Sequence, residues 1–183
     1  VEVGRVGNPE DAVAIDLDGD GQLDVVSSCE GDTRSLYVHW APKDRTELMK
    51  PDAWQTQIIP ASAGMMQFMF SLGLDVNQDG RVDIVTGGKN EDAMLGWFES
   101  PENPRALADW VWHPITPVGW IMSIRSEPRG LENTPALLIS DRRGETRGVC
   151  RLFPVDDPTG RWEKRLIGGG EHEVLFLDYL RYP

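Results

Sequence analysis

Two short acidic loops hold the residue types best suited to chemistry in this chain. Residues 16–24 read DLDGDGQLD, and residues 75–83 read DVNQDGRVD. Each loop has an oxygen-bearing side chain at positions 1, 3, 5 and 9 and a glycine at position 6. Because a hard divalent cation takes six to eight oxygen ligands, the pattern predicts a loop that wraps around such an ion.

Calcium is the ion that this set of ligands favours. Magnesium needs a compact octahedron and keeps its waters, and transition metals prefer His or Cys, which both loops lack. Gln22 and Arg81, at position 7, would contribute backbone carbonyls. We therefore predict two calcium sites. Their ligands would be Asp16, Asp18, Asp20, Gln22 and Asp24 in one loop and Asp75, Asn77, Asp79, Arg81 and Asp83 in the other.

The residues after each loop distinguish the pattern from an EF-hand. An EF-hand needs a bidentate Glu at position 12 and helices on both sides. Position 12 is Ser27 in one loop and Thr86 in the other, and both loops run into β-type sequence, LDVV and VDIV. The remaining alternative is a plain Asp/Gly turn that binds nothing.

Three copies of one pattern fill most of the chain. A tryptophan is followed five residues later by isoleucine at Trp54–Ile59, Trp110–Ile115 and Trp162–Ile167. A short apolar run ends in an aromatic residue at Trp40, Trp97 and Phe153. Because these anchors keep register with the repeat, we interpret the tryptophans as core residues.

One repeat contains four predicted strands, which in the first copy cover residues 12–15, 23–28, 35–40 and 54–59. Four antiparallel strands per repeat form a blade of a β-propeller, so we predict an all-β fold. The chain is one repeat domain, 1–183, with blades over 11–60, 66–116 and 119–168 and extra strands over 1–7 and 172–180. Three blades are too few to close a ring, which implies a longer protein or a homo-oligomer.

The third repeat lacks the acidic loop. Its counterpart, residues 125–138, reads RSEPRGLENTPALL, and Glu127, Glu132 and Asn133 do not restore the spacing. We predict no calcium in this repeat.

Composition excludes several classes of protein. The formal net charge is −12 and no basic run is present, which argues against nucleic-acid binding. The two cysteines, Cys29 and Cys150, form neither a disulfide framework nor a zinc pattern. No apolar run is long enough for membrane insertion.

The segments AIDLDGDGQLDVV and GLDVNQDGRVDIVTGG resemble the core of the FG-GAP/VCBS repeat family, whose propeller blades carry calcium loops between their first two strands. The Phe-Gly and Gly-Ala-Pro landmarks of that family are absent here. The resemblance implies a calcium-dependent protein that is secreted, periplasmic or at the cell surface. It also implies a protein or glycan partner, in adhesion or scaffolding.

A partner surface is predicted from the loops between the second and third strands, residues 29–35, 87–93 and 141–148. Two of them share a Gly-acid-Thr-Arg element. The alternative is a structural turn in which acid and Arg pair locally. Trp120 would stack on a sugar or pack in the core. The predicted partner-binding residues are Arg34, Trp120, Arg142, Arg143 and Arg147.

Three functions compete at this point. We favour a binding or scaffold module, since His39, His113 and His172 occupy unlike positions in the repeat and form no catalytic constellation. The second is a carbohydrate-active lyase or dehydratase, or a fragment of one. Its candidate residues are His113, Glu127, Asp141, Arg142 and Arg143. The third is self-assembly into a structural array.

Overall fold

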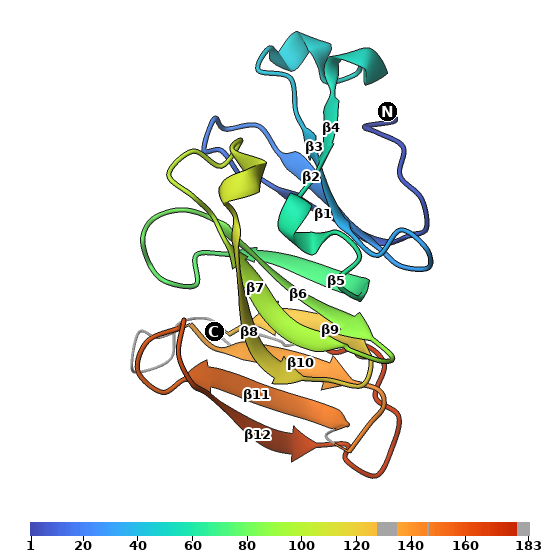
Figure 1. The fold of residues 1–183 in the computed structure, drawn as a ribbon, viewed down its shortest axis with the longest axis vertical. Helices are drawn as coiled ribbons and strands as arrows, with labels where there is room; N and C mark the ends of the chain where they lie inside the picture. Colours follow the sequence, from blue (N-terminus) through green and yellow to red (C-terminus); the bar gives the residue numbers. More distant parts are fainter. Residues whose placement is uncertain (128–134, 146, 179–183) are drawn as a thin grey trace.

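The computed structural model describes residues 1–127, 135–145 and 147–178. The described part contains twelve strands in three four-stranded antiparallel sheets (Figure 1) and no α-helix. This confirms the predicted all-β class. Within each sheet every strand pairs with the strand next to it in the sequence.

Each sheet is built from one stretch of the chain. The first contains β1 (Pro9–Ile15), β2 (Asp24–Cys29), β3 (Leu36–Trp40) and β4 (Gln55–Ile58). The second contains β5 (Gln67–Leu74), β6 (Asp83–Lys89), β7 (Met94–Glu99) and β8 (Val111–Pro117). The third contains β9 (Ile121–Ser126), β10 (Leu137–Asp141), β11 (Gly148–Pro154) and β12 (Trp162–Gly168). Four 3₁₀ turns lie in the connections: η1 (Arg45–Glu47), η2 (Pro51–Ala53), η3 (Pro60–Ser62) and η4 (Leu107–Asp109).

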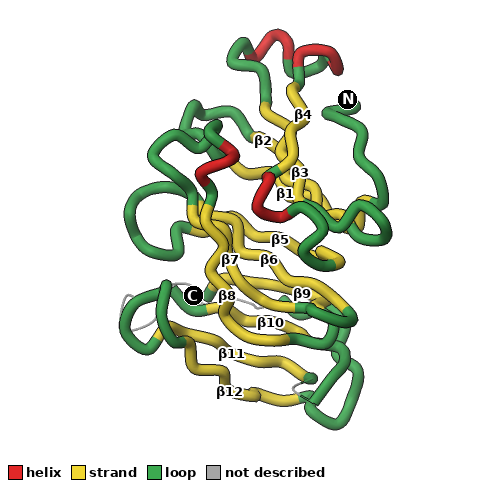
Figure 2. Tube along the Cα trace, in the orientation of Figure 1, coloured by secondary structure: helices red, strands yellow, loops and turns green. Residues whose placement is uncertain are grey.

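The three sheets stack face to face in an open, propeller-like array (Figures 1 and 2). The first strands of successive sheets are neighbours, with β1 next to β5 and β5 next to β9. The loops that follow the first strand of each sheet therefore lie at one end of the array. The loops that follow the second strand lie at the other end.

The middle sheet is buried on both faces. Ile84 and Phe98 point toward the first sheet, whereas their neighbours Val85 and Trp97 point toward the third. Side chains alternate along a strand, so a strand covered on both sides needs a continuous apolar run. This explains the consecutive apolar residues Ile84 and Val85 in β6.

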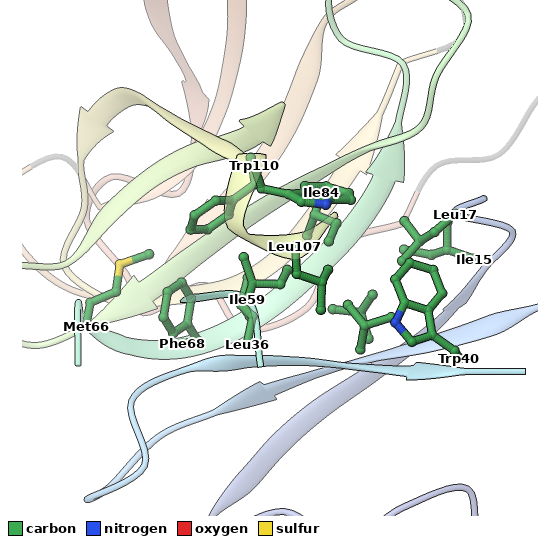
Figure 3. Packing of buried hydrophobic residues seen from close by; sticks show 13 residues of the cluster. Ile15, Leu17, Leu36, Trp40, Ile59, Met66, Phe68, Ile84, Leu107 and Trp110 are labelled. Carbon is green, nitrogen blue, oxygen red and sulfur yellow. The ribbon is translucent and has the colours of Figure 1, made fainter. Parts of the chain in front are cut away.

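The aromatic anchors divide into two groups. Trp40, Trp97 and Trp110 are buried, as predicted, and Figure 3 shows Trp40 and Trp110 within the cluster between the first two sheets. Trp54 and Trp162 are half-buried. The Trp–Ile tryptophans share one role, because each indole Nε1 donates to a carbonyl of the preceding Pro-containing loop. The acceptors are Leu48 for Trp54 (3.1 Å), Pro104 for Trp110 (2.9 Å) and Pro158 for Trp162 (2.7 Å).

The strands predicted over residues 1–7 and 172–180 are not formed in the described residues, and 179–180 lie outside them. Both segments instead lie against the faces of neighbouring sheets. Gly4 sits so close to His39 and Thr56 that a Cβ on it would lie 2.2 Å from the imidazole Nδ1. At the other end, the hydroxyl of Ser123 donates to the Leu177 carbonyl. These segments pack on sheet faces and do not pair with a sheet edge in the described residues.

Glycines set the close approach between sheets. A Cβ on Gly73 would lie 2.7 Å from Ile15 of the first sheet, and one on Gly87 would lie 2.5 Å from Ile121 of the third. We expect Gly87→Ala to lower the free energy of unfolding by about 1–3 kcal/mol, because the methyl group must push the sheets apart. Urea unfolding measures this. The control is Gly168→Ala, where a Cβ meets nothing within 4 Å. Equal stability of Gly87→Ala and wild type would refute the packing assignment.

A second prediction concerns the hydrogen-bonded chain on the outer face of the first sheet. His39 Nε2 lies 2.9 Å from Ser27 Oγ, and Nδ1 lies 2.8 Å from Thr56 Oγ1. Burial lowers the pKa of His39 below its ordinary value of 6.5, so the unfolded chain binds more protons at acidic pH. The contribution of neutral His39 to the free energy of unfolding is therefore fully present above pH 6.5, and it declines as the pH falls below that value. Urea unfolding at pH 7.5 and 5.5 should show this decline, and His39→Gln should reduce it. The exposed His172→Gln is the control and should leave the decline intact.

Candidate functional site

The first acidic loop joins β1 to β2 and brings three predicted ligands together. Carboxylate oxygens of Asp16, Asp18 and Asp20 all lie within 4.8 Å of one another. One oxygen of Asp16, Oδ1, is buried and has no hydrogen-bond partner among the described residues. Clustered carboxylates repel each other, and an orphaned buried oxygen costs free energy, so this loop can hold a cation.

Backbone amides fix the shape of the first loop. The amides of Asp20, Gly21 and Gln22 donate to the side chains of Asp18 (3.3 Å), Asp16 (3.1 Å) and Asp20 (2.9 Å), respectively. Gly21 has φ +84°, a backbone conformation that residues other than glycine rarely adopt. The turn at position 6 is therefore the one that the sequence predicted.

The second acidic loop joins β5 to β6 and repeats this pattern of hydrogen bonds. The amide of Gly80 donates to Asp75 (3.0 Å), the amide of Arg81 donates to Asp79 (2.9 Å), and Gly80 has φ +89°. Two features differ from the first loop. Asn77 replaces a carboxylate, and its Nδ2 donates to Asp79 (2.9 Å). The Arg81 guanidinium also pairs with Asp79.

The side chain of Arg81 was not part of the prediction, which assigned only its backbone carbonyl. Its guanidinium neutralises the loop from within and donates to the Ser100 carbonyl (2.9 Å). A cation in the second loop must compete with this internal charge for Asp79. The donor set of the first loop therefore fits a hard divalent cation better than that of the second.

The position-9 aspartates have a structural role in both sheets. Asp24 is buried and accepts hydrogen bonds from the amides of Leu17 (3.3 Å) and Ala41 (2.8 Å). Burial, with a smaller effect from the nearby Asp18, raises its pKa to about 6. Asp24 thus ties its acidic loop to the connection after β3. Its ligation of a metal stays a prediction.

Asp83 repeats this arrangement in the second sheet. It is buried and accepts from the amides of Val76 (2.9 Å) and Ser100 (2.9 Å). Burial, with smaller effects from Asp79 and Asp75, raises its pKa to about 7. The same residue type at the same loop position therefore makes the same two contacts in both repeats.

Arg105 links the first loop to the second sheet. It extends from the connection between β7 and β8, and its Nε lies 2.6 Å from Asp18 Oδ2. Its guanidinium stacks on the Trp40 ring at 4.6 Å from the centroid. Sequence reasoning missed this residue, because nothing in the repeat marks it.

The counterpart of the acidic loop in the third repeat lies mostly outside the described residues, which omit 128–134. Glu127, at its start, pairs with Arg151 at 2.8 Å. Within the described ranges, Asp16, Asp18 and Asp20 form the one group of three metal-ligating side chains.

A second cluster lies at the opposite end of the array, around Trp120. Lys89 Nζ lies 4.7 Å from the centroid of the Trp120 ring, Arg143 Cζ at 4.5 Å and Arg142 Cζ at 5.2 Å. Asp141, buried at the end of β10, accepts from the Trp120 amide at 2.8 Å and so fixes the link between the second and third sheets. We call Lys89, Trp120, Arg142 and Arg143 the cation cluster.

The cation cluster changes the interpretation of Trp120. Its ring makes cation–π contacts with three side chains. These contacts leave no bare ring face on which a sugar could stack. Lys89 was missed as a single residue, although it belongs to the loop 87–93 that was predicted to lie on this surface. Two carboxylates partly neutralise the cluster: Glu30 pairs with Lys89, and Glu173 accepts from Arg142 at 2.8 Å. The hydrogen bond from Arg142 lowers the pKa of Glu173 below its ordinary range.

The other two predicted partner-binding residues lie outside the cation cluster. Arg34 donates to the Met65 carbonyl (3.4 Å), and Arg147 donates to the Gly170 carbonyl (2.9 Å). The glycines that open the two Gly-acid-Thr-Arg elements, Gly31 and Gly144, both have positive φ. Thr146 lies outside the described residues.

The candidate enzymatic residues are divided among separate partners. His113 lies 2.7 Å from Glu99 and stacks on Trp97, Glu127 pairs with Arg151, and Asp141 accepts backbone amides. Among the described residues, no hydrogen bond or ion pair joins His113 or Glu127 to the Asp141–Arg143 segment.

Comparison of the chain with models of protein families and with curated proteins finds no match. The resemblance to FG-GAP/VCBS repeats therefore remains a prediction from the two loops. In the described part of the chain, no helix has the length and apolarity that a membrane crossing requires.

The third prediction concerns metal and stability. Calcium at about 100 times its dissociation constant should raise the free energy of unfolding by about 2.7 kcal/mol for one site, and EDTA should reverse the gain. Asp16→Asn keeps the loop's shape but removes a charged ligand, so it should abolish most of the stabilisation that calcium in the first loop provides. The control, Asp52→Asn, removes an exposed charge elsewhere and should respond like wild type. Denaturant unfolding curves that are indifferent to calcium and EDTA would contradict the assignment.

Proposed function

We propose that this chain is a calcium-stabilised propeller module of the FG-GAP/VCBS type that binds an anionic protein or glycan partner through its cation cluster. The observation that carries the proposal is the collection of three cationic side chains around Trp120 in a chain of net charge −12. In a chain with this excess of acidic residues, composition alone would not place three positive charges around the Trp120 ring.

The chemistry of the cation cluster favours carboxylate or sulfate groups. Arginine offers a planar fork of donors that matches such anions in a bidentate manner. Arg142 and Arg143 are consecutive, and both lie over Trp120, which limits the entropy lost when they bind. Glu173 already makes this kind of contact with Arg142, so a partner's anion would replace an internal carboxylate.

The calcium loops would serve this surface indirectly. They lie at the other end of the sheets, where a bound ion would hold the first and second strands together and couple metal binding to folding. Binding of the partner should therefore weaken without calcium because the array loosens, and not because an ion bridges to the partner.

A secreted, periplasmic or cell-surface location suits this proposal, because loops of this kind need calcium at the higher concentrations found outside the cytosol. Completion of a ring by further copies of the chain stays a prediction, and no observation here favours it over binding. The separate partners of His113 and Glu127 argue against the lyase or dehydratase alternative.

The fourth prediction tests the cation cluster. The double variant Arg142→Ala/Arg143→Ala should weaken binding to sulfated or carboxylated glycans, or to acidic proteins, by at least about tenfold, the loss expected for one or more charge-assisted contacts. A glycan array and a pull-down, each with calcium and with EDTA, measure this. Arg45→Ala/Arg161→Ala removes the same charge from exposed positions and should bind like wild type. The proposal fails if no anionic partner is retained in calcium, or if both double variants bind equally.

A further inference from the structure

A pocket of about 420 Å³ lies on the third sheet, and its lining includes none of the four residues of the cation cluster. It is lined by residues of β11, β12 and their flanking loops. These are Glu145, Arg147, Cys150, Lys164, Leu166 and Gly170. Pockets of 300–1,000 Å³ are the size that binds small organic ligands.

Lys164 is the unusual residue in this pocket. Its Nζ is buried, and within the described residues it has neither a hydrogen-bond partner nor an ion pair. A buried ammonium without a partner costs free energy unless an anion joins it. Burial raises the pKa of the neighbouring Cys150 thiol, so this thiol stays protonated at neutral pH and does not compensate the charge.

The remaining lining defines the rest of the ligand. Arg147 adds a second positive charge, and its Nε is held by the Gly170 carbonyl at 2.9 Å. Glu145 supplies a carboxylate that accepts hydrogen bonds from hydroxyl groups. Leu166 lies close to Gly148 and Gly170, where it offers an apolar surface for C–H groups. Lys164 and Arg147 carry two positive charges and Glu145 carries one negative charge, so these three side chains have a net charge of +1.

We infer that this pocket binds a sugar-sized, hydroxylated organic carboxylate, whose carboxylate pairs with Lys164. The apolar edge of such a ring packs on Leu166, and its hydroxyls donate to Glu145. The inference rests on the proposed function for its biological setting, since an anionic glycan could place one acidic residue here. It uses different side chains from the cation cluster, so the two are separable by mutation.

The probe for this pocket is glucuronate, and glucose is its neutral counterpart. Isothermal titration of the whole chain in calcium should show saturable binding of glucuronate and at least about tenfold weaker binding of glucose. Lys164→Met removes the ammonium and keeps an unbranched apolar side chain of nearly the same length, so it should weaken glucuronate binding by at least about tenfold. Lys50→Met removes an exposed lysine from the connection between β3 and β4 of the first sheet and should bind glucuronate like wild type.

Each result decides the inference. Equal affinity for glucuronate and glucose, or no binding of either, overturns it without any variant. Unchanged affinity in Lys164→Met also overturns it, provided that circular dichroism shows the variant folded. Loss in Lys164→Met with retention in Arg142→Ala/Arg143→Ala supports it independently of the cation cluster. If the cation cluster binds its partner while glucuronate fails to bind, the proposed function stands and this inference falls.

Discussion

The repulsion among closely spaced carboxylates is the constraint on which the rest of this structure depends. Asp16, Asp18 and Asp20 converge at the end of the first sheet, and the loop holds them there with backbone amides and with Arg105 from the second sheet. In the second loop, the guanidinium of Arg81, a residue of the loop itself, pairs with Asp79. These cations and amides reduce the repulsion, and a divalent ion would remove it. Both loops connect the two innermost strands of a sheet.

The sequence predicted the repeating parts of the molecule well, because repetition samples the same physics several times. Three sheets of four strands, buried Trp40 and Trp97, and glycines of positive φ at position 6 all follow from residues that recur at equivalent places. The gathering of Trp120, Arg142 and Arg143 at the end opposite the acidic loops follows from the up-and-down order of the strands.

The features that sequence reasoning missed depend on contacts made once. Arg105 reaches Asp18 across two sheets, and Lys89 reaches Trp120 from a different sheet, and neither has an equivalent in the repeat. The terminal segments carry alternating apolar residues typical of strands, yet contacts made once, such as Gly4 against His39 and Leu177 with Ser123, place them on sheet faces. Lys164 gave no signal either, since a lysine on a strand is ordinarily solvated.

The central claim is that the two acidic loops bind calcium, and the metal content of the folded chain tests it most directly. Equilibrium dialysis against calcium, followed by elemental analysis, should give two ions per chain at saturation, with the tighter ion lost in Asp16→Asn. A saturated content of zero ions, or a content that Asp16→Asn and Asp75→Asn leave unchanged, would contradict the account.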